Sequence, residues 1–91
     1  MSNRIVITVL GKDKTGIVAG ITNSLAEMKL NIEDMTSGKM QDLFVMLILA
    51  DSSKTKLELG EIKKNLEEAG AKIGVQVIVQ HEDVFRYMHR V

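Results

Sequence analysis

A short segment near the start of the chain combines glycines, lysines and an aspartate in a way that could bind an anion. Residues 11–16 read GKDKTG. The segment follows an apolar run and precedes apolar residues at helical spacing, so it leads into the N-terminus of a helix. Free backbone N–H groups and the helix dipole favour a carboxylate or phosphate there. The same residues also suit an ordinary capped loop, in which Asp13 or Thr15 caps the helix and the lysines are solvated.

Two nucleotide-binding motifs with similar glycines do not fit this segment. Gly11 and Gly16 have the spacing of the P-loop glycines, but Ile17 and Val18 stand where Lys and Ser or Thr are required. A dinucleotide fingerprint needs different glycine spacing and a parallel βαβ repeat, which the sequence does not contain. The segment therefore gives no support for nucleotide hydrolysis, and we expect no cofactor.

Other side chains that could carry chemistry are few. Glu33 and Asp34 are adjacent, but neighbours on a strand point to opposite faces and cannot act as a pair. His81 and His89 are separated by more than two helical turns, which is too far to chelate one metal ion. His81 and the two acidic residues after it are better explained as the acidic start of a helix. The sequence therefore predicts neither a catalytic constellation nor a metal site, and we expect a protein that is not an enzyme.

The composition restricts the class of protein and its partners. A chain of 91 residues corresponds to one domain over residues 1–91, and its 45% apolar content argues against disorder. Lys plus Arg equals Asp plus Glu at 12 each, and this zero net charge disfavours nucleic acid as a partner. The absence of cysteine favours the cytoplasm. The longest apolar run, residues 43–50, is far shorter than the ~20 residues of a membrane span, and we read no signal peptide.

The first half of the chain reads as strand, helix, strand, strand. Residues 4–10 are β-branched and apolar at nearly every position, and we expect the strand to stop at Gly11. Apolar residues recur at helical spacing over 16–29, and Asn31 suits the turn that follows. Residues 31–40 alternate poorly, which indicates a bulge, with a turn either near 38–39 or at 40–42. Residues 43–50 form a continuous apolar run typical of a central strand.

The second half reads as helix, strand and helical tail. Residues 59–69 carry an apolar stripe and a charged face, with Gly70 expected just after the helix as its C-terminal stop. Residues 73–79 alternate apolar and polar, which is typical of a half-buried strand. Apolar residues at helical spacing over 81–91 predict a short terminal helix.

This order predicts an α+β, ferredoxin-like βαββαβ fold with a four-stranded antiparallel sheet, two helices on one face and a short C-terminal helix. Two right-handed crossovers place the first and third strands at the centre, and those are the strands that read apolar throughout. The opposite face of the sheet is then apolar as well, so either the C-terminal helix or a second copy must cover it. We expect a homodimer.

At these residues the chain resembles the ACT domain family, and more narrowly the small stand-alone ACT proteins. The matching segments are ITVLGKDKTGIVAGITNSLAEMKLNIEDM, LFVMLILA and IGVQVIVQHEDVFRYMHRV, which together cover nearly the whole chain. The most specific motif is a strand followed by G-x-D-[KR]-x-G-[IL]-[VL], with an Asn-Ile pair where the second strand starts. Here Gly11, Asp13 and Gly16 carry the first part, and Asn31 and Ile32 carry the second.

The resemblance implies a role in regulation. ACT domains bind amino acids or other small metabolites between paired domains, with contacts from the first strand-to-helix loop and the start of the second strand, often across the dimer. Matched by position, the implied ligand-binding residues are Asp13, Lys14, Thr15, Gly16, Ile17, Asn31 and Ile32. Asp13 could receive an ammonium group, and Asn31 can both donate and accept hydrogen bonds. Most ACT domains are attached to an enzyme or a DNA-binding domain; this sequence contains neither, so the protein it regulates must be another polypeptide.

Three other functions fit the predicted topology. The domain could have lost its ligand and act as a protein-association module. An acylphosphatase needs an arginine in the first loop, and this loop has lysines, with Arg4 the nearest arginine. An RNA-binding sheet needs aromatic residues on its central strands, and only Phe44 is present there.

Overall fold

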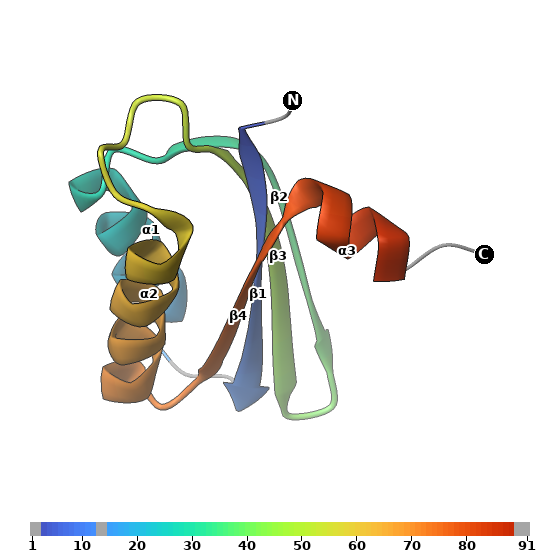
Figure 1. Cartoon of the computed structure of the whole chain (residues 1–91). Helices are drawn as coiled ribbons and strands as arrows, with labels where there is room; N and C mark the ends of the chain where they lie inside the picture. The colour runs from blue at the N-terminus through green and yellow to red at the C-terminus, as the bar shows by residue number, and fades with distance from the viewer. Residues whose placement is uncertain (1–2, 13–14, 89–91) are drawn as a thin grey trace.

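The elements follow one another in the expected order in the computed structural model, which describes residues 3–12 and 15–88 (Figure 1). They are β1 (Arg4–Lys12), α1 (Ile17–Glu27), β2 (Asn31–Met40), β3 (Leu43–Asp51), α2 (Leu59–Ile73), β4 (Gln76–His81) and α3 (Glu82–Met88). The predicted ferredoxin-like βαββαβ fold with a C-terminal helix is confirmed. None of the helices in the described ranges is long and apolar enough to cross a bilayer.

The sheet has the order β2-β3-β1-β4 with antiparallel pairing throughout, so the first and third strands lie at its centre as predicted. β1 and β3 are the two central strands because their apolar residues can be buried on both faces. β1 pairs with β3 along its full length, from Arg4 opposite Asp51 to Lys12 opposite Leu43. This ladder places the two ends of β1 at opposite ends of the sheet.

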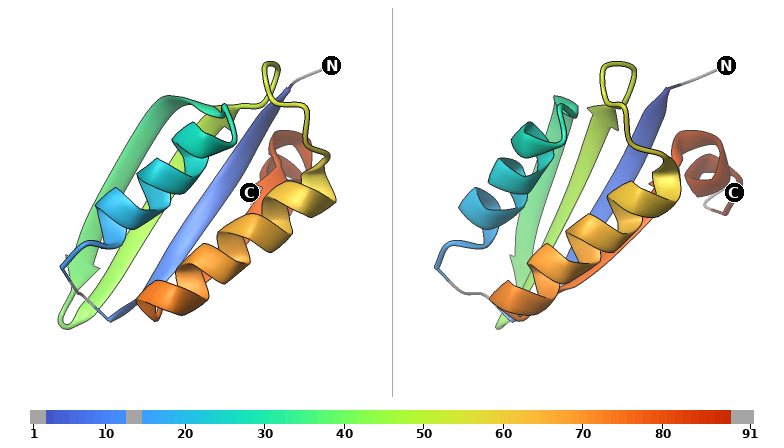
Figure 2. Two further views of the ribbon diagram at one scale, coloured as in Figure 1. Left: turned by 90° about the vertical axis from the view of Figure 1, so that its left-hand side faces the viewer. Right: turned by 60° about the vertical axis from the view of Figure 1, so that its left-hand side comes forward.

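The main core lies between the sheet and the two long helices. Alternate residues of the central strands point toward α1 and α2, which cover the same face (Figure 2). The residues least accessible to solvent are Ile7, Val9, Ile17, Ile21, Leu25, Met46, Ile48, Ile62 and Leu66. The core is thus aliphatic and methionine-rich, as the near absence of aromatic residues predicted.

β2 is an edge strand whose ten residues are all exposed. The predicted bulge lies at Glu33, where the register with β3 shifts between Ile32 and Asp34. The sequence left the turn either near residues 38–39 or at 40–42, and the structure has the turn at the later position. β2 continues to Met40, and the chain turns at Gln41, which has a φ of 58°.

Several predicted boundaries were wrong by a few residues. β1 does not stop at Gly11, because Gly11 and Lys12 still pair with β3. The turn after α1 is made by Lys29, which has a φ of 61°, and Asn31 instead begins β2.

The prediction that Gly70 terminates the second helix was also wrong. α2 continues through Gly70 to Ile73, and Gly74, with a φ of 91°, is its C-cap. Gly70 is required for close packing instead, because a Cβ there would lie 2.5 Å from Cγ2 of Val77. The longer helix also delays the last strand, so β4 begins at Gln76 rather than Ile73.

The short helix α3 lies on the other face of the sheet from α1 and α2 (Figure 1). That face carries the alternate residues of the central strands, including Val6, Leu47 and Leu49. Val6 is buried, while Leu47 and Leu49 are half-buried. The C-terminal helix therefore covers part of the apolar face. This is one of the two arrangements expected from the sequence, the other being cover by a second copy.

Candidate functional site

The N-terminus of α1 is shaped by Gly16, which has a φ of 89° and is the N-cap of the helix. The expectation that Thr15 caps this helix was wrong, because the left-handed turn at Gly16 delays helix entry by one residue. Asp13 and Lys14 lie outside the described residues. Thr15 and Gly16 are exposed, whereas Ile17 is buried in the core, so Ile17 can offer a ligand only its backbone.

The space around the helix N-terminus is open. A Cβ placed on Gly16 would meet no described atom within 4 Å. The first N–H groups of a helix have no partner within the helix, and among the described residues no side chain caps this end of α1. The geometry thus leaves room for an anion to approach the backbone at the first turn of α1.

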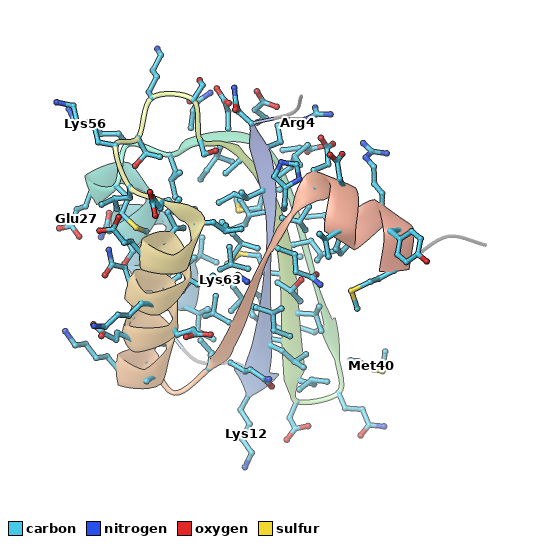
Figure 3. The ribbon with its side chains drawn as sticks, viewed as in Figure 1. Arg4, Lys12, Glu27, Met40, Lys56 and Lys63 are labelled. Carbon is cyan, nitrogen blue, oxygen red and sulfur yellow. The ribbon has the colours of Figure 1, made fainter. Side chains whose placement is uncertain are left out.

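Asn31 and Ile32 lie at the opposite end of the sheet from this turn. Asn31 pairs with Asp51, which in turn pairs with Arg4 at the start of β1. Figure 3 shows Arg4 at one end of the molecule and Lys12, which leads into the α1 loop, at the other. At ~3.3 Å per residue, the eight steps from Arg4 to Lys12 correspond to about 26 Å. Within one chain, the structure does not bring the two halves of the predicted site together.

The sequence reasoning did not identify an exposed apolar margin along this side of the domain. Val18 on α1 and Ile32 and Met35 on β2 are 42%, 36% and 44% exposed. Val18 lies on the flank of α1 that faces away from α2, since Gly20 and Ser24 on the other flank line the groove between the helices. We call Val18, Ile32 and Met35 the edge patch.

A second feature, also missed, is an ionic cluster at the start of α3. Glu82 is only 4% exposed, although its side chain ends in a carboxyl group. It accepts hydrogen bonds from Arg4 Nε and Nη2 at 3.1 and 2.6 Å, and from Arg86 Nε and Nη2 at 3.2 and 2.8 Å. Arg4 also forms an ion pair with Glu33 of β2, with 3.5 Å between Nη1 of Arg4 and Oε1 of Glu33. The hydrogen bond to Glu82, followed by the attraction of its charge, raises the pKa of the Arg4 guanidinium above its ordinary value.

This cluster joins three separate parts of the chain. Sequence reasoning correctly placed the start of a helix near Glu82, but a local acidic pattern gives no information about partners 78 residues away. Because two arginines share one carboxylate, the cluster fixes α3 against the N-terminal end of β1.

We predict that Glu82→Gln loosens α3 while leaving the rest of the fold intact. A neutral amide cannot satisfy two guanidinium groups, so α3 should open more often. Its amide protons should exchange roughly tenfold faster, measured by hydrogen exchange, with β1 and β3 unchanged. Asp83→Asn is the control, since Asp83 is on the same helix and its side chain is 69% exposed. Equal protection of α3 in all three proteins would contradict this role for Glu82.

One of the alternative functions, an acylphosphatase, finds no support in this geometry. Arg4, the arginine nearest to the first loop, lies at the far end of β1 from that loop and is bound to Glu82. It therefore cannot supply the phosphate-binding arginine of an acylphosphatase. Among residues 3–12 and 15–88, no group of three His, Asp or Glu side chains is arranged to hold a metal ion.

Comparison with known proteins identifies the family. The model of the ACT domain matches residues 3–80. This chain belongs to the ACT domain family. It is 53% identical over 89 residues to a UPF0237 protein of Methanocaldococcus jannaschii, covering 98% of this chain and 99% of the relative. An ACT domain protein from Streptococcus pneumoniae, of solved structure, is 33% identical with a TM-score of 0.82, covering 93% of this chain and 96% of that one.

The ACT fold also occurs in larger proteins. The regulatory subunit of aspartate kinase from Thermus thermophilus is 22% identical with a TM-score of 0.67, covering 88% of this chain and 52% of that subunit. At this identity the likeness concerns the fold alone. The ACT fold is typical of regulatory domains that bind small ligands.

Proposed function

We propose that two copies of this ACT domain pair through their β2 edges and bind a small carboxylate ligand, most simply an amino acid, between them. Each of two equivalent sites combines the α1 N-terminus of one copy with Asn31 and Ile32 of the other. The ligand changes how the dimer contacts a separate, regulated protein in the cytoplasm. The domain itself catalyses no reaction.

The observation that carries this proposal is the exposed β2 strand. β2 is an edge strand with all ten residues exposed, so one side of its backbone faces solvent rather than another strand, and such an edge favours pairing with a further strand. The other edge strand, β4, is less available, since it is shorter and has Val77 and Val79 buried. The edge patch adds apolar surface on the β2 side.

The symmetry of such a pair supports a shared site. A two-fold axis makes the β2 strands of the two copies antiparallel, so the Asn31 end of one strand lies beside the Met40 end of the other. The Met40 end is level with Leu43 and Lys12, and therefore with the loop that leads into α1. The residues that one chain separates by about 26 Å thus approach one another across the dimer.

The chemistry of the combined site suits an α-amino acid. The free N–H groups of the first turn of α1, beside Gly16, can take the ligand carboxylate. The side-chain amide of Asn31 can accept a hydrogen bond from the ligand ammonium group or donate one to the ligand carboxylate. Asp13 and Lys14 are proposed from the family motif to complete the site, with Asp13 receiving the ammonium group.

We predict that a thermal shift screen against the twenty amino acids gives at least one stabilising ligand. A ligand at 100 times its Kd adds about 2.7 kcal/mol to the free energy of unfolding. Asn31→Ala should weaken that ligand about tenfold, since it removes a hydrogen bond to a charged group. Asn23→Ala is the matched control, because Asn23 is an exposed amide on α1.

The screen also decides between the two remaining roles. If no amino acid raises the melting temperature of a dimeric protein, the domain is better described as an association module without a ligand. A response that is equal in Asn31→Ala and Asn23→Ala would contradict the proposed place of Asn31 in the site.

A further inference from the structure

A pocket of about 280 Å³ lies on the open face of the sheet, between α3 and the strands β2 and β3. Val6, Leu47 and Leu49 supply apolar side chains from the sheet, and Phe85 supplies another from α3. Asp34 and Arg86 place opposite charges in the same lining. Met35 of the edge patch also lines this pocket, but none of the described residues proposed to bind the ligand in the dimer does.

Arg86 is positioned by the ionic cluster at the start of α3. Its Nε and Nη2 atoms both donate to Oε2 of Glu82, and the buried carboxylate of Glu82 is held in turn by Arg4. The described hydrogen bonds of Arg86 use Nε and Nη2 of its planar guanidinium group, which leaves Nη1 to donate to another acceptor. The guanidinium group is therefore preorganised, and its side chain is still 66% exposed.

Asp34 supplies the complementary charge from the edge strand. Its Oδ1 atom accepts a hydrogen bond from the backbone N–H of Met35 at 2.9 Å, which orients the carboxylate. Oδ2 has no hydrogen-bond partner among the described residues. The pocket thus combines an oriented cation with spare donors, an oriented carboxylate with a spare acceptor, and an apolar floor.

We propose that this pocket is a second binding site, specific for a zwitterionic α-amino acid with an aliphatic side chain. The ligand carboxylate binds Arg86, its ammonium group binds Asp34, and its side chain contacts Val6, Leu47 and Leu49. This site goes beyond the proposed function, because it is formed within one chain and does not require the dimer.

The lining argues for this class of ligand over others. A volume of about 280 Å³ is at the lower end of small-molecule pockets, which favours a ligand of few atoms. A fatty acid would leave Asp34 without a cation, and an amine would leave Nη1 of Arg86 without an acceptor. An amino acid with a charged side chain would bury that charge against leucine and valine without a partner, at high cost.

The test uses L-leucine as the probe, with two analogues that each lack one charge. Isothermal titration calorimetry should show saturable binding of L-leucine, at least tenfold weaker binding of 4-methylpentanoate and 3-methylbutylamine, and none of L-aspartate. Arg86→Gln and Asp34→Asn should each weaken L-leucine about tenfold to a hundredfold. Asp83→Asn, an exposed carboxylate on the same helix, should bind as the unmodified protein does.

Methyl NMR spectra locate the bound probe. Shifts confined to Val6, Leu47 and Leu49 that persist in Asn31→Ala support the pocket. Absence of L-leucine binding, or binding that survives Arg86→Gln, overturns it. Shifts at Ile17 and Ile32 that vanish in Asn31→Ala would also overturn it while leaving the proposed dimer site intact. If the pocket binds L-leucine but no ligand depends on Asn31, the pocket proposal is supported and the proposed dimer site is contradicted.

Discussion

Met35→Lys is expected to convert the dimer into a monomer and to abolish the ligand response that depends on Asn31. Met35 is 44% exposed near the middle of the β2 edge, where the two copies would meet. A lysine there places like charges beside the two-fold axis, and natural edge strands use lysine to prevent such pairing. Light scattering after size exclusion should give a mass near 10.1 kDa rather than twice that value.

Ile78→Lys is the matched control for this variant. Ile78 is 39% exposed and lies on β4, the other edge strand, so the substitution is chemically similar at the opposite side of the sheet. It should leave both the mass and the ligand response unchanged. If Ile78→Lys lost the dimer and Met35→Lys kept it, the interface would lie on β4, and the proposed pairing through β2 would be contradicted.

Gly70→Ala is expected to lower the free energy of unfolding by about 1 kcal/mol. The added Cβ would lie 2.5 Å from Cγ2 of Val77 and 2.9 Å from the backbone oxygen of Val75. Because one of these atoms belongs to the backbone, α2 and β4 must separate, and overpacking of this kind costs ~1–3 kcal/mol. Helix propensity returns up to about 1 kcal/mol of that loss. The melting temperature should fall by about 6 °C.

Gly60→Ala in the same helix is the control for Gly70→Ala. No described atom lies within 4 Å of a Cβ at position 60, so only helix propensity changes. The melting temperature should rise by a few degrees. If calorimetry gave the two alanine variants the same stability, the close approach of α2 to β4 would not be the reason for glycine at position 70.

The fold was predictable from the sequence because its signals are redundant. The continuous apolar runs of β1 and β3 and the alternation around Val77 each indicate a strand, and the topology rules then order them. The boundaries of the elements were less predictable, since a glycine can either end a helix or allow close packing within one. Gly70 reads as a helix stop, yet it is a packing glycine, and Gly74 four residues later provides the stop.

The candidate site was predictable only in its parts. The motif identifies Gly16 and Asn31, but only the strand register shows that they lie at opposite ends of the sheet. The charges of the open-face pocket were harder still to predict. Asp34 on β2 and Arg86 on α3 resemble ordinary surface residues, because nothing in their local sequence reports that the fold brings them to one pocket.

A mixing experiment tests most directly whether the ligand site is shared between two copies. Thr15→Asp adds a carboxylate beside the expected position of the ligand carboxylate, and Asn31→Ala removes a hydrogen bond from the other half of the site. Each variant alone should bind the ligand about tenfold more weakly or worse. Mixed dimers contain one site with Thr15 from one copy and Asn31 from the other, so in an equal mixture about one quarter of the sites should bind with the affinity of the unmodified protein. No regain of binding in dimers shown to have exchanged subunits would contradict the shared site.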